Sequence, residues 1–223
     1  SSISMTLDGL ETRTRVAFQE GLDGDRLTIN GDAVHGEGLR RVSRLLDRVR
    51  KHTGLQLSAS VTSKNNFPMA SGIASSSSAF AALSVAASSA AGLDLNEIEL
   101  SRLARTGSGS ACRSIPGGFV EWQAGTGHED SYAEAFAGPD HWDVVDLVTV
   151  VSTAHKETGS TRGHTLADTS PLQQARVRDA PRRLARCRSA ILEWDFQTFA
   201  SVVERDSNMM HAVMMTSQPP LLY

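Results

Sequence analysis

The chain has 223 residues, enough for one large domain or for one domain and part of a second. Its 40% hydrophobic and 21% charged residues are ordinary for a globular protein, and a formal net charge of −3 argues against a general nucleic-acid-binding protein. The two cysteines, Cys112 and Cys187, are too few for a disulfide framework, and no apolar run is long enough to span a membrane. We therefore expect a cytoplasmic protein without nucleic-acid or membrane partners.

Alternating hydrophobicity predicts three short strands near the start of the chain. Residues 2–7 and 12–18 alternate on either side of the Asp8-Gly9 turn signal, so we expect these two strands to pair antiparallel. Residues 26–29 are the third strand, followed by Asn30-Gly31, a strong hairpin signal. Because the chain starts inside a strand, we expect further residues before it.

An amphipathic helix is predicted for residues 37–52, ended by Gly54, with most of its arginines facing water. The apolar side chains expected to face the core are Leu39, Val42, Leu45, Leu46 and Val49. Residues 55–62 alternate again and predict a strand that leads into the next segment.

Residues 65–83, NNFPMASGIASSSSAFAAL, begin as a loop, turn at Gly72 and continue as a helix from Ala74 to about Ala91. A turn of small residues that opens a helix offers free N–H groups and the positive end of the helix dipole, which favours an anion site. A flexible Ser/Ala linker is the alternative, but linkers do not carry apolar residues such as Ile73 and Phe80 at helical spacing. The segment lacks the Walker pattern.

A second segment rich in small residues follows the next helix, which we expect Asp94 to cap with Glu97 at the capping-box position. This segment is residues 106–113, TGSGSACR. Two Gly/Ser segments at helix ends indicate either two anions or one polyanionic ligand held between them. Arg113 is placed to clamp a carboxylate or phosphate bidentately, whereas a structural ion pair is the alternative.

The remainder of the chain changes from strands to helices. A strand is predicted for residues 119–123, a polar loop for 125–140, and a nearly continuous apolar, central strand for 144–151. A polar loop at residues 156–164 precedes two helices, at 172–194 and 196–215.

The helix at residues 172–194 carries a run of arginines, for which a solvated face is favoured over a binding patch. These are Arg176, Arg178, Arg182, Arg183, Arg186 and Arg188. No general base stands out: His211, near Asp206 and Asn208 in the last helix, is more often a polar residue with satisfied hydrogen bonds than a catalyst.

Five segments together resemble a known family. Residues 65–83 resemble the phosphate loop of the GHMP kinase superfamily. SGSACRSIPGGFVEW at residues 108–122 closely resembles a motif of the diphosphomevalonate decarboxylases, as do SSISMTLD at the start, KETGSTRG at 156–163 and DSNMMHA at 206–212. The segments follow the family order along the whole chain.

The resemblance implies a two-domain α+β fold of the GHMP kinase kind. Residues 1–152 would form the N-terminal domain, with a mixed sheet and helices, and residues 153–223 a partial, mainly helical C-terminal domain. It also implies an enzyme that uses ATP and Mg²⁺ to phosphorylate and decarboxylate mevalonate 5-diphosphate, giving isopentenyl diphosphate. Homodimers are common in such families.

The resemblance further implies site residues. Those for ATP are Pro68, Ala70, Ser71, Gly72, Ser75 and Ser76. Those for the substrate are Ser108, Gly109, Ser110, Ala111, Cys112, Arg113, Ser160 and Thr161. Arg113 and Ser75 would be the catalytic residues, and no protein side chain is expected to bind a metal.

Two family motifs are missing from this sequence: a Lys-Tyr-Trp-Gly-Lys type motif near the N-terminus and the later Asp-Ala-Gly-Pro-Asn motif with the family's catalytic aspartate. We therefore expect a central fragment that alone binds ligands weakly and does not turn over. A phosphomevalonate decarboxylase or a mevalonate 3-kinase is the first alternative. A more distant alternative is a non-catalytic binding module, which only the arginine-rich helix supports.

Overall fold

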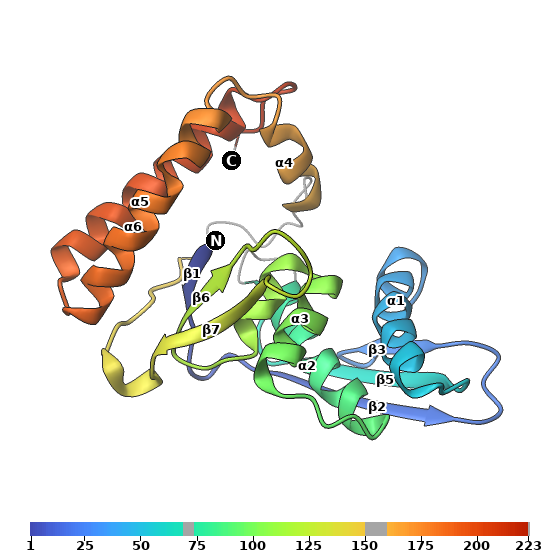
Figure 1. The fold of residues 1–223 in the computed structure, drawn as a ribbon. Helices are drawn as coiled ribbons and strands as arrows, with labels where there is room; N and C mark the ends of the chain where they lie inside the picture. Colours follow the sequence, from blue (N-terminus) through green and yellow to red (C-terminus); the bar gives the residue numbers. More distant parts are fainter. Residues whose placement is uncertain (69–73, 150–159, 223) are drawn as a thin grey trace. The chain divides into compact units, whose positions relative to one another are not determined.

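The computed structural model describes residues 1–68, 74–149 and 160–222, except for the side chains of residues 160–162. These divide into two compact units, one of residues 2–139 and one of residues 140–223 together with Ser1 (Figure 1). The domain boundary predicted at residue 152 lies outside the described residues, so it stays a prediction.

A four-stranded mixed sheet lies in the first unit, in the order β2 (Thr12–Gln19), β5 (Ser58–Asn65), β3 (Arg26–Ile29), β4 (Asp32–Val34). The pairs β2–β5 and β3–β4 are antiparallel, and β3–β5 is parallel. Asn30 and Gly31 join β3 to β4 with φ angles of 53° and 99°, so the predicted hairpin is confirmed.

A second, antiparallel sheet has the order β1 (Ser2–Met5), β6 (Phe119–Gln123), β7 (Tyr132–Ala137). Two predictions are therefore wrong. First, β1 pairs with β6 rather than with β2, because alternation specifies a strand but not its partner. Second, residues 125–140 are not only loop: the alanine-rich β7 has a weak strand signal and is formed by its pairing with β6.

Three α-helices complete the first unit: α1 (Gly36–Thr53), α2 (Ser75–Ala90) and α3 (Glu97–Gly107). The apolar stripe of α1 packs with that of α2 against one face of the four-stranded sheet, and Gly54 ends α1 with a φ of 73°, as predicted. The cluster includes Val42, Leu45, Leu46 and Val49 of α1, Phe80, Leu83 and Ala87 of α2, and Val16, Leu27 and Val61 of the sheet.

The cap of α3 differs from the prediction. Asn96 and Glu99, rather than Asp94 and Glu97, form the capping box: the Asn96 side chain accepts from the Glu99 N–H, and the Glu99 carboxylate accepts from the Asn96 N–H. Both pairs have the same spacing, so the sequence is compatible with either capping box. After α3 the chain forms a short 3-10 helix, η1 (Gly109–Ser114), where the sequence predicted a loop.

Helices make up most of the described second unit: the short 3-10 helix η2 (Pro139–His141) at its start, then α4 (Ser160–Ala167), α5 (Gln173–Leu192) and α6 (Phe196–Met215). The predictions of α5 and α6 are confirmed. Ala167 of α4 packs with Val213 and Met214 of α6. The polar loop predicted for 156–164 is wrong from Ser160 onward, where α4 begins, and residues 156–159 lie outside the described part.

The central strand predicted for residues 144–151 is wrong for residues 144–149, which form no strand, while residues 150 and 151 are not described. Val145 and Leu147 are 84% and 87% exposed. A buried strand needs neighbours on its edges, and the described part of this unit offers only helices. Among the described residues, no helix is both long and apolar enough to cross a lipid bilayer.

Candidate active site

The first turn of α2 begins without a side-chain cap. Its N-cap is Ala74, which has no side chain that can cap a helix and adopts a left-handed φ of 43°. The backbone N–H groups of Ser77 and Ser78 donate hydrogen bonds to the Ala74 carbonyl at 2.9 and 3.3 Å. An uncapped helix start with a strained backbone is typical of anion sites. Ser76 is exposed there, whereas Ser77 is buried.

The second Gly/Ser segment lies directly against this turn. The hydroxyl oxygens of Ser77 and Ser110 are 2.5 Å apart, and those of Ser76 and Ser108 are 3.5 Å apart. The fold therefore brings together two segments more than thirty residues apart in the chain. Of the two predicted arrangements, this one favours a single polyanionic ligand over two separate anions.

Buried contacts hold η1 in place behind the serines. The Cys112 thiol donates to the Gly109 carbonyl at 3.1 Å, and the buried Ser101 hydroxyl donates to the Cys112 carbonyl at 3.1 Å. Burial raises the pKa of the Cys112 thiol, so it stays neutral. Ala111 and Cys112 are fully buried, so of these two predicted substrate residues only the backbone is available to a ligand.

Arg113, at the end of η1, is a partly buried cation. One of its terminal nitrogens donates to the Ser2 hydroxyl, and its guanidinium lies 6.0 Å from the centre of the Trp122 ring. Within the described ranges no carboxylate lies at ion-pair distance, and the Arg113 Nε is buried without a hydrogen-bond partner. Burial lowers the pKa of Arg113. These contacts do not support the structural ion pair, because the guanidinium has no carboxylate partner among the described residues.

Not every predicted site residue can be placed. Pro68 lies in the loop after β5, whereas Ala70, Ser71 and Gly72 lie outside the described residues. Ser160 and Thr161 begin α4 in the second unit, and their side chains are not described.

Sequence reasoning missed Thr12 and Arg41. The Thr12 hydroxyl, at the start of β2, donates to the Asn65 Oδ1 at 2.7 Å and lies 2.8 Å from the Ser78 hydroxyl in the first turn of α2. Arg41 of α1 donates to the Gly107 carbonyl at 2.9 Å, just before the second Gly/Ser segment. For Arg41 a signal existed: it precedes Leu45 by four residues and so lies beside the apolar stripe.

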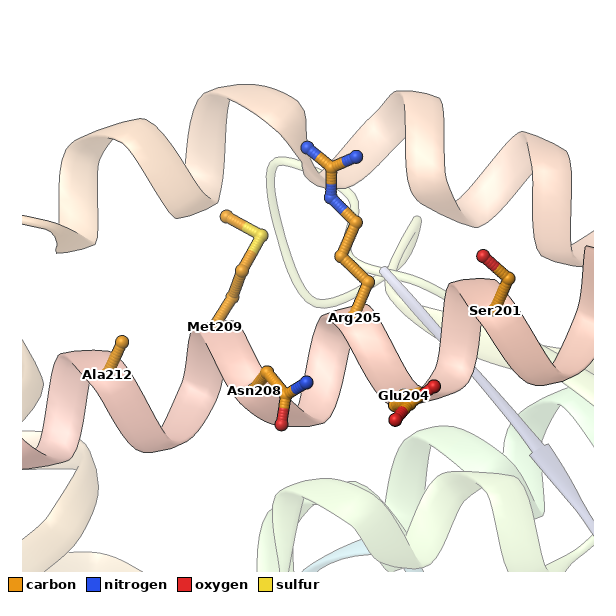
Figure 2. A pocket seen from close by; sticks show the side chains of 6 residues that line it. All are labelled: Ser201, Glu204, Arg205, Asn208, Met209 and Ala212. Carbon is orange, nitrogen blue, oxygen red and sulfur yellow. The ribbon is translucent and has the colours of Figure 1, made fainter.

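The described part of the second unit contains a surface cavity of about 560 Å³ along α6 (Figure 2). Its lining residues are Ser201, Glu204, Arg205, Asn208, Met209 and Ala212, which follow one another along a single helix face. A reactive site normally has polar groups that converge from several elements. Therefore the serine segments and Arg113 are the stronger candidate.

The α+β fold, in which a serine-rich helix start meets a second Gly/Ser segment that ends at the partly buried Arg113, is a fold of the GHMP kinase kind. Residues 1–133 match the model of the diphosphomevalonate decarboxylase-like N-terminal domain, and residues 146–223 match that of the mevalonate 5-diphosphate decarboxylase C-terminal domain. The chain belongs to the diphosphomevalonate decarboxylase family, which confirms the resemblance.

Individual relatives agree with this membership. The diphosphomevalonate decarboxylase of Debaryomyces hansenii is 40% identical over 100% of this chain and 62% of its own length. The crystal structure of mevalonate diphosphate decarboxylase from Staphylococcus aureus has a TM-score of 0.90 and 36% identity, covering 99% of this chain and 67% of the other. The structure of MDDEF in complex with MVAPP, AMPPCP and magnesium has a TM-score of 0.90 and 33% identity, with coverages of 99% and 68%. The chain thus spans less than two thirds of the Debaryomyces relative.

Proposed function

We propose that the protein acts as a diphosphomevalonate decarboxylase. It would convert mevalonate 5-diphosphate and ATP into isopentenyl diphosphate, ADP, phosphate and carbon dioxide. The observation that carries the proposal is the partly buried Arg113, which has no carboxylate partner among the described residues and follows the serine segment that touches the start of α2. Family membership, and a relative whose structure holds MVAPP, AMPPCP and magnesium, support the same assignment.

The start of α2 suits the phosphates of ATP. Ala74 and Ser76 are exposed at the uncapped first turn, and the small side chain of Ala74 would let a phosphate approach the backbone. We assign ATP binding to this turn, including Ser75, and to the preceding loop with Pro68, Ala70, Ser71 and Gly72. When bound, MgATP supplies the phosphoryl group that makes the 3-hydroxyl of the substrate a good leaving group.

Magnesium would be held mainly by phosphate oxygens. Within the described residues no group of three or more His, Cys, Asp or Glu side chains gathers to form a cation site. Mg²⁺ keeps several waters and is commonly bound through substrate phosphates with few protein ligands. The serine hydroxyls at the start of α2 fit that arrangement, because they can donate hydrogen bonds to the phosphates without competing for the ion.

Arg113 would hold the carboxylate that leaves as carbon dioxide. A guanidinium accepts a carboxylate in a planar, bidentate geometry and so fixes its orientation. Because the negative charge of the carboxylate disappears as carbon dioxide forms, a strong hydrogen bond to it stabilises the ground state. Arg113 therefore acts chiefly by orienting the substrate, with the Ser2 hydroxyl holding the guanidinium in place.

The other substrate contacts belong to the same proposal. Ser108, Gly109 and Ser110 would contact the substrate, and Ala111 and Cys112 would do so through their backbone. Ser160 and Thr161 at the start of α4 would contact its diphosphate end. We further propose that the protein works as a cytoplasmic homodimer.

The test supplies the whole protein, in purified form, with MgATP and, in turn, with mevalonate, its 5-phosphate and its 5-diphosphate, while ADP and carbon dioxide are measured together. Equal release of both products with the diphosphate alone is expected. Release with the monophosphate would instead indicate a phosphomevalonate decarboxylase, and ADP without carbon dioxide would indicate a mevalonate 3-kinase. If the whole protein is folded and forms neither product, the proposal is wrong.

A nucleic-acid-binding module is disfavoured by the ion pairs of the basic helix. Arg176, Arg182 and Arg183 are paired with Asp179 or Asp206. Arginines that are already neutralised release few counterions from a nucleic-acid backbone. Salt-dependent binding to random RNA would speak for this alternative.

A further inference from the structure

Arg41 differs from the other arginines of α1 in what it contacts. Arg40 and Arg44 pair with Glu37 on the exposed face, whereas Arg41 is half-buried and reaches toward α3. It donates to the Gly107 carbonyl at 2.9 Å, and its guanidinium lies 4.8 Å from the centre of the Phe80 ring. One side chain thus contacts both helices that carry the serine segments.

The position of Gly107 depends on its having no side chain. A Cβ atom built on Gly107 would lie 2.1 Å from Cδ1 of Phe80, far inside van der Waals contact. The Phe80 ring therefore fills the space beside the end of α3, and it is itself 7% exposed. Arg41 lies over the same ring, so Arg41, Phe80 and Gly107 form one packed group, called here the Arg41 clamp.

The Arg41 clamp is adjacent in the chain to the contacts between the serines. Gly107 directly precedes Ser108, and Phe80 lies about one helical turn after Ser76 and Ser77. A shift between Phe80 and Gly107 would change the 3.5 Å separation of the Ser76 and Ser108 hydroxyls and the 2.5 Å separation of the Ser77 and Ser110 hydroxyls.

We propose that Arg41 is a positioning residue that fixes the start of α2 against the second Gly/Ser segment. In this position the two segments can together hold the two polyanionic reactants, ATP and mevalonate 5-diphosphate. This inference rests on the function proposed above. Filling space on Phe80 alone would not require an arginine, because a methionine packs on a ring without the cost of desolvating a charge. The guanidinium adds a hydrogen bond to a carbonyl at the end of α3, where helix carbonyls lack partners and a positive charge is favourable.

The experiment compares Arg41→Met and Arg41→Lys with Arg48→Met, a matched control at an exposed position of the same helix. Binding of AMPPCP with magnesium and of mevalonate 5-diphosphate is measured by calorimetry, together with the melting temperature. Loss of the hydrogen bond should weaken AMPPCP binding about three- to tenfold in Arg41→Met. Arg41→Lys keeps a hydrogen-bond donor, so its affinity for AMPPCP should lie between those of Arg41→Met and the wild type. Arg48→Met should bind AMPPCP like the wild type.

A second variant, Gly107→Ala, changes the same contact at α3. It should weaken AMPPCP binding at least as much as Arg41→Met does. The double variant should bind AMPPCP only slightly more weakly than either single variant, because both changes act on one contact. The inference is overturned if Arg41→Met binds as the wild type does, or if Arg41→Lys is no better than Arg41→Met at equal melting temperature. Should Arg41→Met not fold, the comparison of Arg41→Lys and Gly107→Ala with the wild type decides. A folded wild type that binds neither ligand would instead refute the proposed function, and this inference with it.

Discussion

At the scale of single residues, Arg113 shows how burial and charge together indicate a ligand. Its Nε is buried without a partner, and within the described ranges no carboxylate neutralises it. Burying such a cation costs free energy, because the folded protein replaces its hydration only in part. The Ser2 hydroxyl supplies one hydrogen bond but no charge. A group kept at this cost is best explained by an anion that binds to it.

We expect Arg113→Gln to weaken the binding of mevalonate 5-diphosphate about 10- to 100-fold, the typical value of a hydrogen bond to a charged group. Arg113→Lys should recover only part of this affinity, because an ammonium cannot make the bidentate contact. Calorimetry with mevalonate 5-diphosphate measures both variants. Arg13→Gln is the control, since Arg13 of β2 is exposed and paired with Glu11, which precedes that strand. Unchanged affinity in a folded Arg113→Gln would show that Arg113 does not hold the substrate.

At the scale of elements, the hairpin of α5 and α6 uses its arginines internally. Arg183 is 6% exposed, and its guanidinium contacts Asp179 of α5 and Asp206 of α6 at 2.9 and 2.8 Å. Arg176 also pairs with Asp206, at 3.5 Å. Ion pairs that join two helices restrict how one can slide along the other. The run of arginines in the sequence therefore has a structural role at these positions.

These ion pairs predict acid sensitivity of the hairpin. Hydrogen bonds from Arg182 and Arg183 lower the pKa of Asp179 from an ordinary 3.8 to about 2. A carboxylate whose pKa is lowered by folding stabilises the folded state above its ordinary pKa, and this contribution is lost as the pH falls through the folded value. We expect α5 and α6 to lose amide-exchange protection between pH 4 and 2, with a smaller pH dependence in Asp179→Asn. Equal pH dependence in wild type and variant would contradict this role.

At the scale of the whole molecule, each unit has its own apolar cluster. In residues 2–139 the largest cluster joins α1 and α2 to the four-stranded sheet, and Leu46 at its centre is fully buried. In residues 140–223, Val213 is 2% exposed and packs with Ala167 and Met214. Compact units with separate cores commonly open as separate cooperative units.

Core truncations should therefore act on the unit that contains them. We expect Leu46→Ala to cost about 2–5 kcal/mol of stability, the usual range for a buried leucine, and to reduce amide-exchange protection mainly in residues 2–139. Val213→Ala should reduce protection mainly in residues 160–222. Exchange measured by mass spectrometry on both variants, with the more exposed Leu10→Ala as control, tests this. A uniform loss of protection along the chain in both variants would contradict it.

Features that depend on neighbours in the chain could be predicted from the amino-acid order. The period of apolar residues indicated α1 and α2, and Asn30-Gly31 indicated the hairpin, because helix faces and tight turns arise within a few residues. The small residues before and within α2 indicated an anion site on the same local basis. The combination of motifs indicated the family.

Features that depend on partners far away in the chain could not be predicted from the amino-acid order. Alternation in residues 2–7 did not identify β6 as the partner of β1, β7 is formed only by pairing, and the apolar residues 144–149 are not a strand in the described structure. Strand pairing joins segments of any separation, and periodicity carries no record of the partner. For the same reason, the contact between Ser77 and Ser110 and the Arg41 clamp appear only when the folded chain brings residues from different elements together. The same holds for the lack of a carboxylate partner of Arg113 among the residues that the structure describes.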